Sequence, residues 1–175
     1  MYVNKNSTHR SVEQGVLRGR PFGGVMILVS NGLQKITRVI CATDRYVVVA
    51  VGFTLFVNVY FPCVGSVDRL FIYEELIDNL SVCLNNFPTY KLVIGGDFNT
   101  DLDKYCPASS LVGSFMSTYG LHRCDLLFPA NRIATFFNDV LGTESYIDYI
   151  LVSDASIGRV SGNGSILRLL VEVAL

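Results

Sequence analysis

The sequence lacks a concentration of positive charge. Its 14 lysine and arginine residues are spread along 175 residues, are matched by 15 acidic residues, and gather only modestly at Arg18 and Arg20. Proteins that depend on many phosphate contacts usually carry a basic stripe, because each neutralised phosphate releases counterions. The composition therefore excludes binding to nucleic acid through a general positive field, and any such binding must use a local site.

From the sequence we also expect no cysteine pairs, no leader peptide and no membrane span. The five cysteines occur singly, with no C-x-x-C pair, which is typical of thiols in the reducing nucleus or cytoplasm. Cys106, His122 and Cys124 outline a zinc site only loosely, without a fourth ligand. Met1–Gln14 is polar and has no apolar signal-peptide region, and the most apolar run, Val47–Val57, is shorter than a bilayer span. We therefore expect an intracellular chain with no membrane contact.

Apolar residues, in contrast, are abundant. Hydrophobic residues make up 50% of the chain and charged residues 17%, a balance that favours one globular domain over disorder. Short apolar runs predict strands at Val25–Val29, Ile36–Cys41, Tyr46–Val51, Thr54–Tyr60, Lys91–Gly95, Arg132–Phe137 and Tyr146–Val152. The spacing of the first four strands is typical of an antiparallel meander.

Two helices interrupt the strands. Apolar residues between Leu70 and Phe87 recur at three- and four-residue steps, and a second helix is predicted over Ser109–Tyr119, with Gly120 as its stop. This order of elements predicts an α+β fold with two layers of strands and helices packed outside them.

An acid and an amide follow a buried strand in Gly95-Gly96-Asp97-Phe98-Asn99. If the backbone stays extended, Asp97 and Asn99 point to the same side, since strand side chains alternate. A carboxylate beside an amide could orient a water and hold a phosphate oxygen. The alternative interpretation is an ordinary Asp/Asn turn after a strand.

Tyr60 and Asp148 are two further candidates. Tyr60 ends an apolar strand before Phe61-Pro62, and its phenol either donates to a phosphate or is simply half-buried with its hydroxyl in water. Asp148 lies between large apolar residues. Because an unpaired buried carboxylate is costly, we expect a partner such as a histidine or a backbone donor.

Four motifs together resemble one family. They are, in chain order, Gly19–Val25, Asn58–Pro62, Gly95–Thr100 and Ile147–Ile150. Together they resemble motifs of the endonuclease/exonuclease/phosphatase (DNase I-like) superfamily, and their residues are most similar to those of its LINE-type retrotransposon branch. The resemblance covers residues 16–153. It implies a four-layered α/β/β/α sandwich that hydrolyses DNA phosphodiesters with Mg²⁺, and residues 16–175 would then form a partial domain behind a polar lead, residues 1–15.

The resemblance also implies roles for the candidate residues. Asp97 matches the aspartate that aligns or activates the attacking water, and Tyr60 matches the phosphate-contacting tyrosine. Asn99 matches the asparagine that holds the phosphate and that aspartate in place. Asp148 matches the aspartate that orients a catalytic histidine. Thr135 matches a threonine on the preceding strand, and Thr135 and Ser145 are the expected substrate-binding residues.

The metal-binding glutamate of the family and its closing Asp-His pair have no counterpart in this sequence. Glu13 lies too close to Gly23 to be the metal-binding glutamate of a Gln-Glu motif, and Leu167–Val173 stands where the closing Ser-Asp-His is expected. Both histidines, His9 and His122, precede Asp148. We therefore expect a domain truncated at both ends, with no assignable metal ligand and no catalytic activity. The alternatives are an active nuclease completed by residues encoded upstream or by another chain, and a non-enzymatic remnant or binding module.

Overall fold

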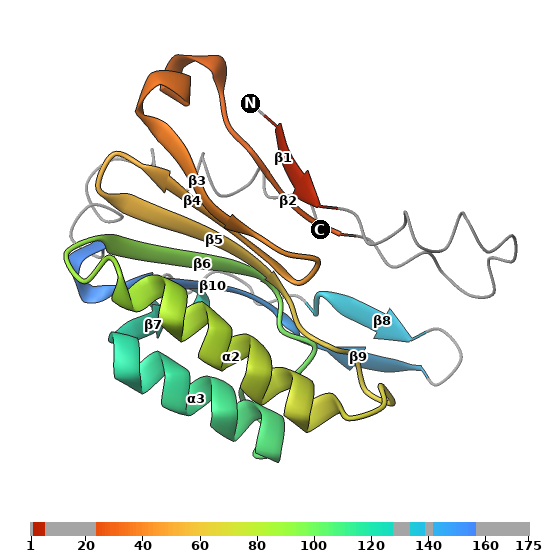
Figure 1. The fold of residues 1–175 in the computed structure, drawn as a ribbon. Helices are drawn as coiled ribbons and strands as arrows, with labels where there is room; N and C mark the ends of the chain where they lie inside the picture. Colours follow the sequence, from red (N-terminus) through yellow and green to blue (C-terminus); the bar gives the residue numbers. More distant parts are fainter. Residues whose placement is uncertain (1, 6–23, 128–133, 139–141, 157–175) are drawn as a thin grey trace, which may run out of the picture.

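A six-stranded sheet forms the centre of the computed structural model, which describes residues 2–5, 24–127, 134–138 and 142–156 (Figure 1). Its strands, in spatial order, are β3 (Thr37–Ala42), β4 (Tyr46–Val51), β5 (Thr54–Tyr60), β6 (Lys91–Asp97), β10 (Asp148–Ser153) and β7 (Leu121–Arg123). Neighbouring strands are antiparallel except β5 and β6, which are parallel. A separate hairpin of β8 (Phe136–Asn138) and β9 (Thr143–Ser145) precedes β10.

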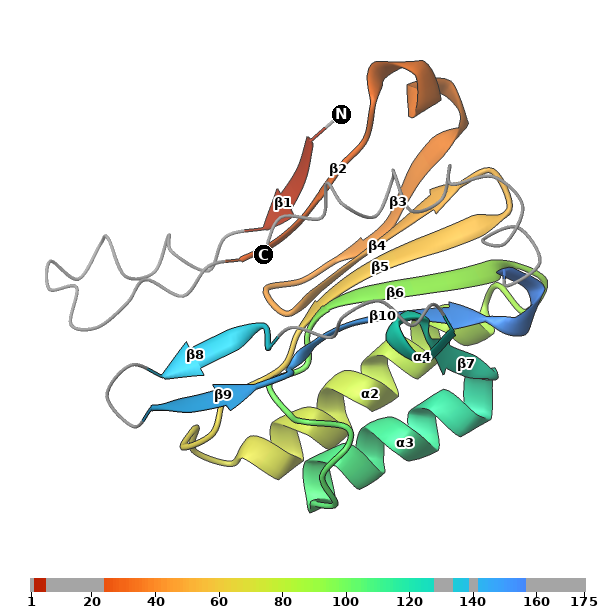
Figure 2. The same cartoon turned by 180° about the vertical axis from the view of Figure 1, so that it is seen from behind.

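Helices cover one face of this sheet. α2 (Arg69–Asn85) and α3 (Pro107–Tyr119) lie side by side there, as both views show, while the short α4 (Cys124–Leu127) follows β7 (Figures 1 and 2). Both predicted helices are thus confirmed, including the left-handed Gly120 that ends α3 at φ 56°. The core joins helix residues to one set of alternating strand residues: Tyr73, Leu76, Leu80, Leu84, Val112, Phe115, Val57, Val59, Ile94 and Leu151. No helix among the described residues is long and apolar enough to cross a membrane.

The opposite face carries a second, small sheet of β1 (Tyr2–Lys5) and β2 (Val25–Leu28) (Figure 2). The predicted four-strand meander is therefore wrong for its first strand, and only β3–β4–β5 form one. A 3-10 helix, Asn31–Ile36, connects β2 to β3. It lets Val25 and Ile27 pack over the buried β4 residues Val47 and Val49 instead of pairing beside them.

The described residues thus form the predicted α+β architecture in the layer order helix, sheet, sheet. A buried amide connects the two sheets, because Nδ2 of Asn58, on β5, donates to the Met26 carbonyl at 2.9 Å. The Gly19–Gly23 motif, Glu13 and Leu167–Val173 lie outside the described residues.

Gly96 controls how closely β6 approaches β5. Its φ is +139°, a conformation that L side chains rarely adopt, and a Cβ built there would lie 2.0 Å from the Val59 carbonyl oxygen. A Cβ on the neighbouring Gly95 would meet only Ile150 and Tyr149 atoms at 3.8 Å, an ordinary contact. Glycine at position 96 is therefore a requirement of this strand pairing, whereas glycine at position 95 is not.

Gly96→Ala should lower the free energy of unfolding by about 3 kcal/mol or more, because it combines backbone strain with a clash against a neighbouring strand. Gly95→Ala is the matched control and should cost less than about 1 kcal/mol. Urea denaturation followed by circular dichroism measures both. Equal losses in the two variants would contradict this account of the β5–β6 contact.

Candidate active site

Three predicted site residues lie in one row across the central sheet. The parallel register pairs Tyr60 of β5 with Asp97 of β6, and the antiparallel register pairs Asp97 with Asp148 of β10. Residues directly opposite each other on neighbouring strands project from the same face. Tyr60 packs with the cluster that faces β2, so the row lies on the face away from α2 and α3. All three residues are partly buried.

Asn99 joins this row through a turn rather than an extended strand. β6 ends at Asp97, and Asn99 has φ +48° in the left-handed region. The expectation that an extended backbone aligns the two side chains is therefore wrong. Instead, the Asn99 backbone N–H donates to Asp97 Oδ1 at 2.8 Å, and its Nδ2 donates to the Phe61 carbonyl at 2.8 Å. Asn99 thus fixes the Asp97 carboxylate and ties this turn to the end of β5.

Arg69 and Tyr73, on the first turns of α2, hold this turn from the helix side. Arg69 donates through Nη2 to the Asn99 carbonyl at 2.7 Å and through Nε to the Pro62 carbonyl at 3.2 Å. The fully buried Tyr73 donates its hydroxyl to the Phe98 carbonyl. These contacts satisfy carbonyls that the turn would otherwise leave without partners.

Asp148 is held by the hairpin that precedes it. Thr135 Oγ1 accepts from the N–H groups of Ile147 and Asp148 at 3.1 and 3.2 Å, and the Thr135 side chain also hydrogen-bonds the Asp148 carboxylate. Ser145, at the end of β9, contributes its carbonyl, which accepts from the Thr135 N–H at 3.0 Å. Asp148 thus has a partner in the Thr135 hydroxyl, rather than in the histidine or backbone donor expected from the sequence, and the structure brings Thr135 and Ser145 to the Asp148 end of the row.

Burial dominates the electrostatics of the row. It raises the pKa of Asp97 to about 6, with the negative charge of Asp148 adding to the rise and hydrogen bonds from Asn99 opposing it. Burial also raises the pKa of Asp148, against the hydrogen bond from Thr135. The pKa of Tyr60 is raised by burial and by the charge of Asp97. Near neutral pH, Asp97 is therefore a stronger base than an ordinary carboxylate.

Arg45, which the sequence did not identify as a candidate, lies just before β4 and extends the row by one position. The Tyr60 N–H donates to the Arg45 carbonyl at 2.8 Å, and the Arg45 guanidinium carbon lies 5.3 Å from the centre of the Tyr60 ring. The predicted strands Tyr46–Val51 and Thr54–Tyr60 could have indicated this position. If they form a hairpin in which Val51 pairs with Thr54 across a two-residue turn, the same register places Arg45 opposite Tyr60.

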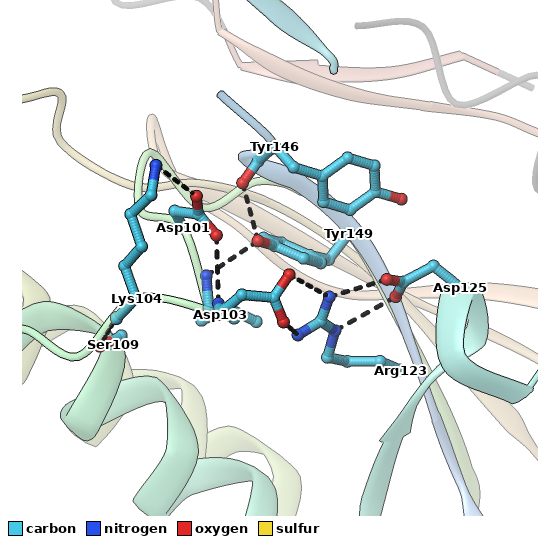
Figure 3. Close-up of polar contacts among 9 residues, drawn as sticks. Asp101, Asp103, Lys104, Ser109, Arg123, Asp125, Tyr146 and Tyr149 are labelled. Carbon is cyan, nitrogen blue, oxygen red and sulfur yellow. Dashed lines mark hydrogen bonds and ion pairs between the residues drawn. The ribbon is translucent and has the colours of Figure 1, made fainter. Parts of the chain in front are cut away.

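Arg123, a second residue that the sequence did not identify as a candidate, holds the loop that follows Asn99 in place (Figure 3). The guanidinium is 7% exposed and pairs with Asp103 and Asp125, in each case at 2.7 Å. It also stacks over Tyr149, whose hydroxyl accepts from the Leu102 N–H at 2.9 Å. Asp103 and Asp125 lie on separate segments, so these contacts anchor the loop to β7, α4 and β10.

The described residues do not fit a metal centre by themselves. Among residues 2–5, 24–127, 134–138 and 142–156, no three His, Cys, Asp or Glu side chains come together as a ligand group, and this includes the zinc outline of Cys106, His122 and Cys124. His122 instead pairs with Asp154 at 2.6 Å. Asp97 and Asp148 are two carboxylates with raised pKa values, so each retains its proton to higher pH than an ordinary acid. We therefore derive no chemical step through a metal ion.

Asp97→Asn should stabilise the fold at neutral pH. The pKa of Asp97 in the folded state lies above its ordinary value of 3.8, so ionisation disfavours folding, and stability falls as pH rises between these values. The amide keeps an oxygen for the Asn99 N–H but carries no charge. We expect a gain in the free energy of unfolding of about 1 kcal/mol at pH 7.5, allowing for solvent screening, and none near pH 3.5.

Urea denaturation at the two pH values measures this difference. Asp78→Asn, on the exposed side of α2, is the matched control. It should change the free energy of unfolding by the same amount at both pH values. A variant Asp97→Asn that is less stable than the wild type at pH 7.5 would disprove the proposed electrostatic cost.

Comparison with known proteins gives likenesses in structure only. No family model matches the sequence, and no curated protein matches it. The endonuclease domain of TRAS1, a telomere-specific non-LTR retrotransposon, superposes with a TM-score of 0.53 and 18% identity, over 67% of this chain and 54% of that domain. The 3'-5' exonuclease NExo from Neisseria meningitidis gives a TM-score of 0.50 and 20% identity, over 65% of this chain and 54% of the exonuclease.

The chain thus spans about half the length of each of these solved structures. At 18% and 20% identity the likeness concerns the fold, and it agrees with the layer order and sheet described above. The chain has the DNase I-like fold, as these two nucleases do.

Proposed function

We propose that this chain is part of the endonuclease domain of a LINE-type retrotransposon, and that its site addresses a DNA phosphodiester. The observation that carries the proposal is the row of Tyr60, Asp97 and Asp148 on one face of the sheet. We further propose that the 175-residue chain by itself does not cleave DNA.

The residues of the row can perform the first half of a hydrolysis. Asp97, with its pKa raised to about 6, is suited to accept a proton from an attacking water near neutral pH. Asn99 holds the carboxylate in place through its backbone N–H, which donates to Asp97 Oδ1. The Tyr60 phenol can donate to a phosphate oxygen, and Thr135 keeps Asp148 in place beside Asp97.

The second half of the reaction lacks its residues in this chain. A departing alkoxide needs a proton or a positive charge, and no histidine follows Asp148 in the sequence. The resemblance implies Mg²⁺ at this point, but its ligands would have to come from outside the described residues. Loss of members of a cooperating site typically lowers the rate by orders of magnitude.

A second candidate is an active nuclease completed by residues encoded upstream or by another chain. The coverage of 54% of both neighbours favours it, since almost half of each neighbour has no counterpart here. A non-enzymatic binding module has less support, because the net charge of −1 provides no general attraction to DNA.

The chain is also proposed to act inside the cell, in the nucleus or cytoplasm. All five of its cysteines are free thiols, and disulfides are rare in reducing compartments. We also propose that residues 16–175 form the domain. Tyr2–Lys5, which belong to the predicted polar lead, nevertheless form β1 and pair with β2 in the second sheet.

The purified 175-residue chain should not nick supercoiled plasmid in the presence of Mg²⁺. The same chain, extended by the residues encoded in frame before Met1 and after Leu175, should nick it if the second candidate is right. In such an active form, Asp97→Ala should lower the rate by about 10²–10⁴-fold through loss of the base.

Gel electrophoresis of the plasmid forms gives the rates, and Asp78→Ala, an exposed aspartate of α2, is the matched control that should retain full activity. Nicking by the 175-residue chain that disappears with Asp97→Ala would overturn the proposal of inactivity. If the extended chain nicks the plasmid at the same rate with and without Asp97→Ala, the assignment of the site is wrong.

A further inference from the structure

Arg45 continues the row of candidate residues to a position just before a fourth strand. It directly precedes β4, and its carbonyl accepts from the Tyr60 N–H at 2.8 Å, next to the Tyr46–Val59 pair of the β4–β5 hairpin. Tyr60, Asp97 and Asp148 follow on β5, β6 and β10. One line across the sheet therefore carries a guanidinium, a phenol and two carboxylates in that order.

The guanidinium of Arg45 has no acidic partner among the described residues. None of the ion pairs formed within residues 2–5, 24–127, 134–138 and 142–156 includes it. It lies over the Tyr60 ring instead, with 5.3 Å between its carbon and the ring centre. Arg123, in contrast, is neutralised by two aspartates. Stacking on an aromatic face orients a guanidinium while leaving its N–H groups available.

The row also has a charge imbalance that Arg45 can correct. Asp97 and Asp148 lie side by side, and the charge of Asp148 contributes to the raised pKa of Asp97. A phosphodiester that approaches Tyr60 is repelled by both carboxylates. A cation on the other side of Tyr60 would offset this repulsion and attract the phosphate to the phenol.

We propose that Arg45 is a phosphate-binding residue, which with Tyr60 holds a backbone phosphate of the nucleic acid beside Asp97. This rests on the proposed function, because it assigns a further contact in the same site. A planar guanidinium suits the task, since it donates two parallel hydrogen bonds to phosphate oxygens. Its stacking on Tyr60 would keep the phenol and the cation in one orientation.

Fluorescence anisotropy with a labelled duplex oligonucleotide tests this proposal. The full chain is titrated in EDTA over a series of NaCl concentrations at pH 6, near the raised pKa of Asp97, where this carboxyl group repels phosphate less than at neutral pH. Arg45→Ala should weaken binding about tenfold and reduce the slope of log affinity against log salt by about 0.9, the contribution of one phosphate contact. Arg45→Lys should keep the slope.

Arg38→Ala is the matched control. Arg38 also lies over an aromatic ring, Phe87, at 5.7 Å, but on β3 and outside the row. The substitution Arg38→Ala removes one positive charge, as Arg45→Ala does, and should leave the slope of log affinity against log salt unchanged. Thermal unfolding of each variant tests for an altered fold, which would not by itself change the slope.

The outcomes separate the two proposals. If Tyr60→Phe weakens binding while Arg45→Ala behaves like Arg38→Ala, the site stands and the role of Arg45 is disproved. If the wild-type chain does not bind the duplex, both proposals fail. Weaker binding and a lower slope in Arg45→Ala, with neither change in Arg38→Ala, support the contact.

Discussion

The parallel pairing of β5 with β6 is the constraint on which the candidate site depends. Gly96 lets the two strands approach closely, because any side chain there would meet the Val59 carbonyl. This approach sets the register that places Tyr60 opposite Asp97, and β10 then adds Asp148 on the other side. A shift of one residue would move Asp97 to the helix-covered face, where a carboxylate would lie among the apolar residues of the core.

The site is locally unfavourable, and its surroundings hold it in place. Two neighbouring carboxylates with raised pKa values cost free energy at neutral pH. Arg69 fixes the Asn99 turn from α2, and Arg123 fixes the following loop from β7. A contact from α2 and an ion-pair cluster centred on the buried Arg123 therefore both act on one short segment. This arrangement is typical of functional sites, whose unfavourable groups persist because rigid neighbours determine their positions.

Elements with strong local patterns could be predicted from the sequence, whereas their partners could not. The period of α2 and the Gly120 stop of α3 are local signals, and so are the apolar runs of β4 and β5. The sheet to which β2 belongs depends on Asn58 and on packing over Val47 and Val49, contacts between residues far apart in the chain. Arg123 likewise pairs with Asp103 across 20 residues. The sequence allowed either an extended strand or a turn at Asn99, and the left-handed backbone conformation of Asn99 shows that it is a turn.

Charge distribution explains why the location of the site matters more than the composition of the chain. A net charge of −1 over 175 residues provides no field that would draw DNA from a distance. Recognition of a phosphodiester must then come from groups within a few ångströms of it, where partial burial reduces screening by salt. Arg45 and Tyr60 are the groups proposed for this contact: Tyr60 lies opposite Asp97, the carboxylate proposed to activate water, and Arg45 stacks on Tyr60. A chain of this composition is therefore suited to position one phosphate and unsuited to long-range attraction of a duplex.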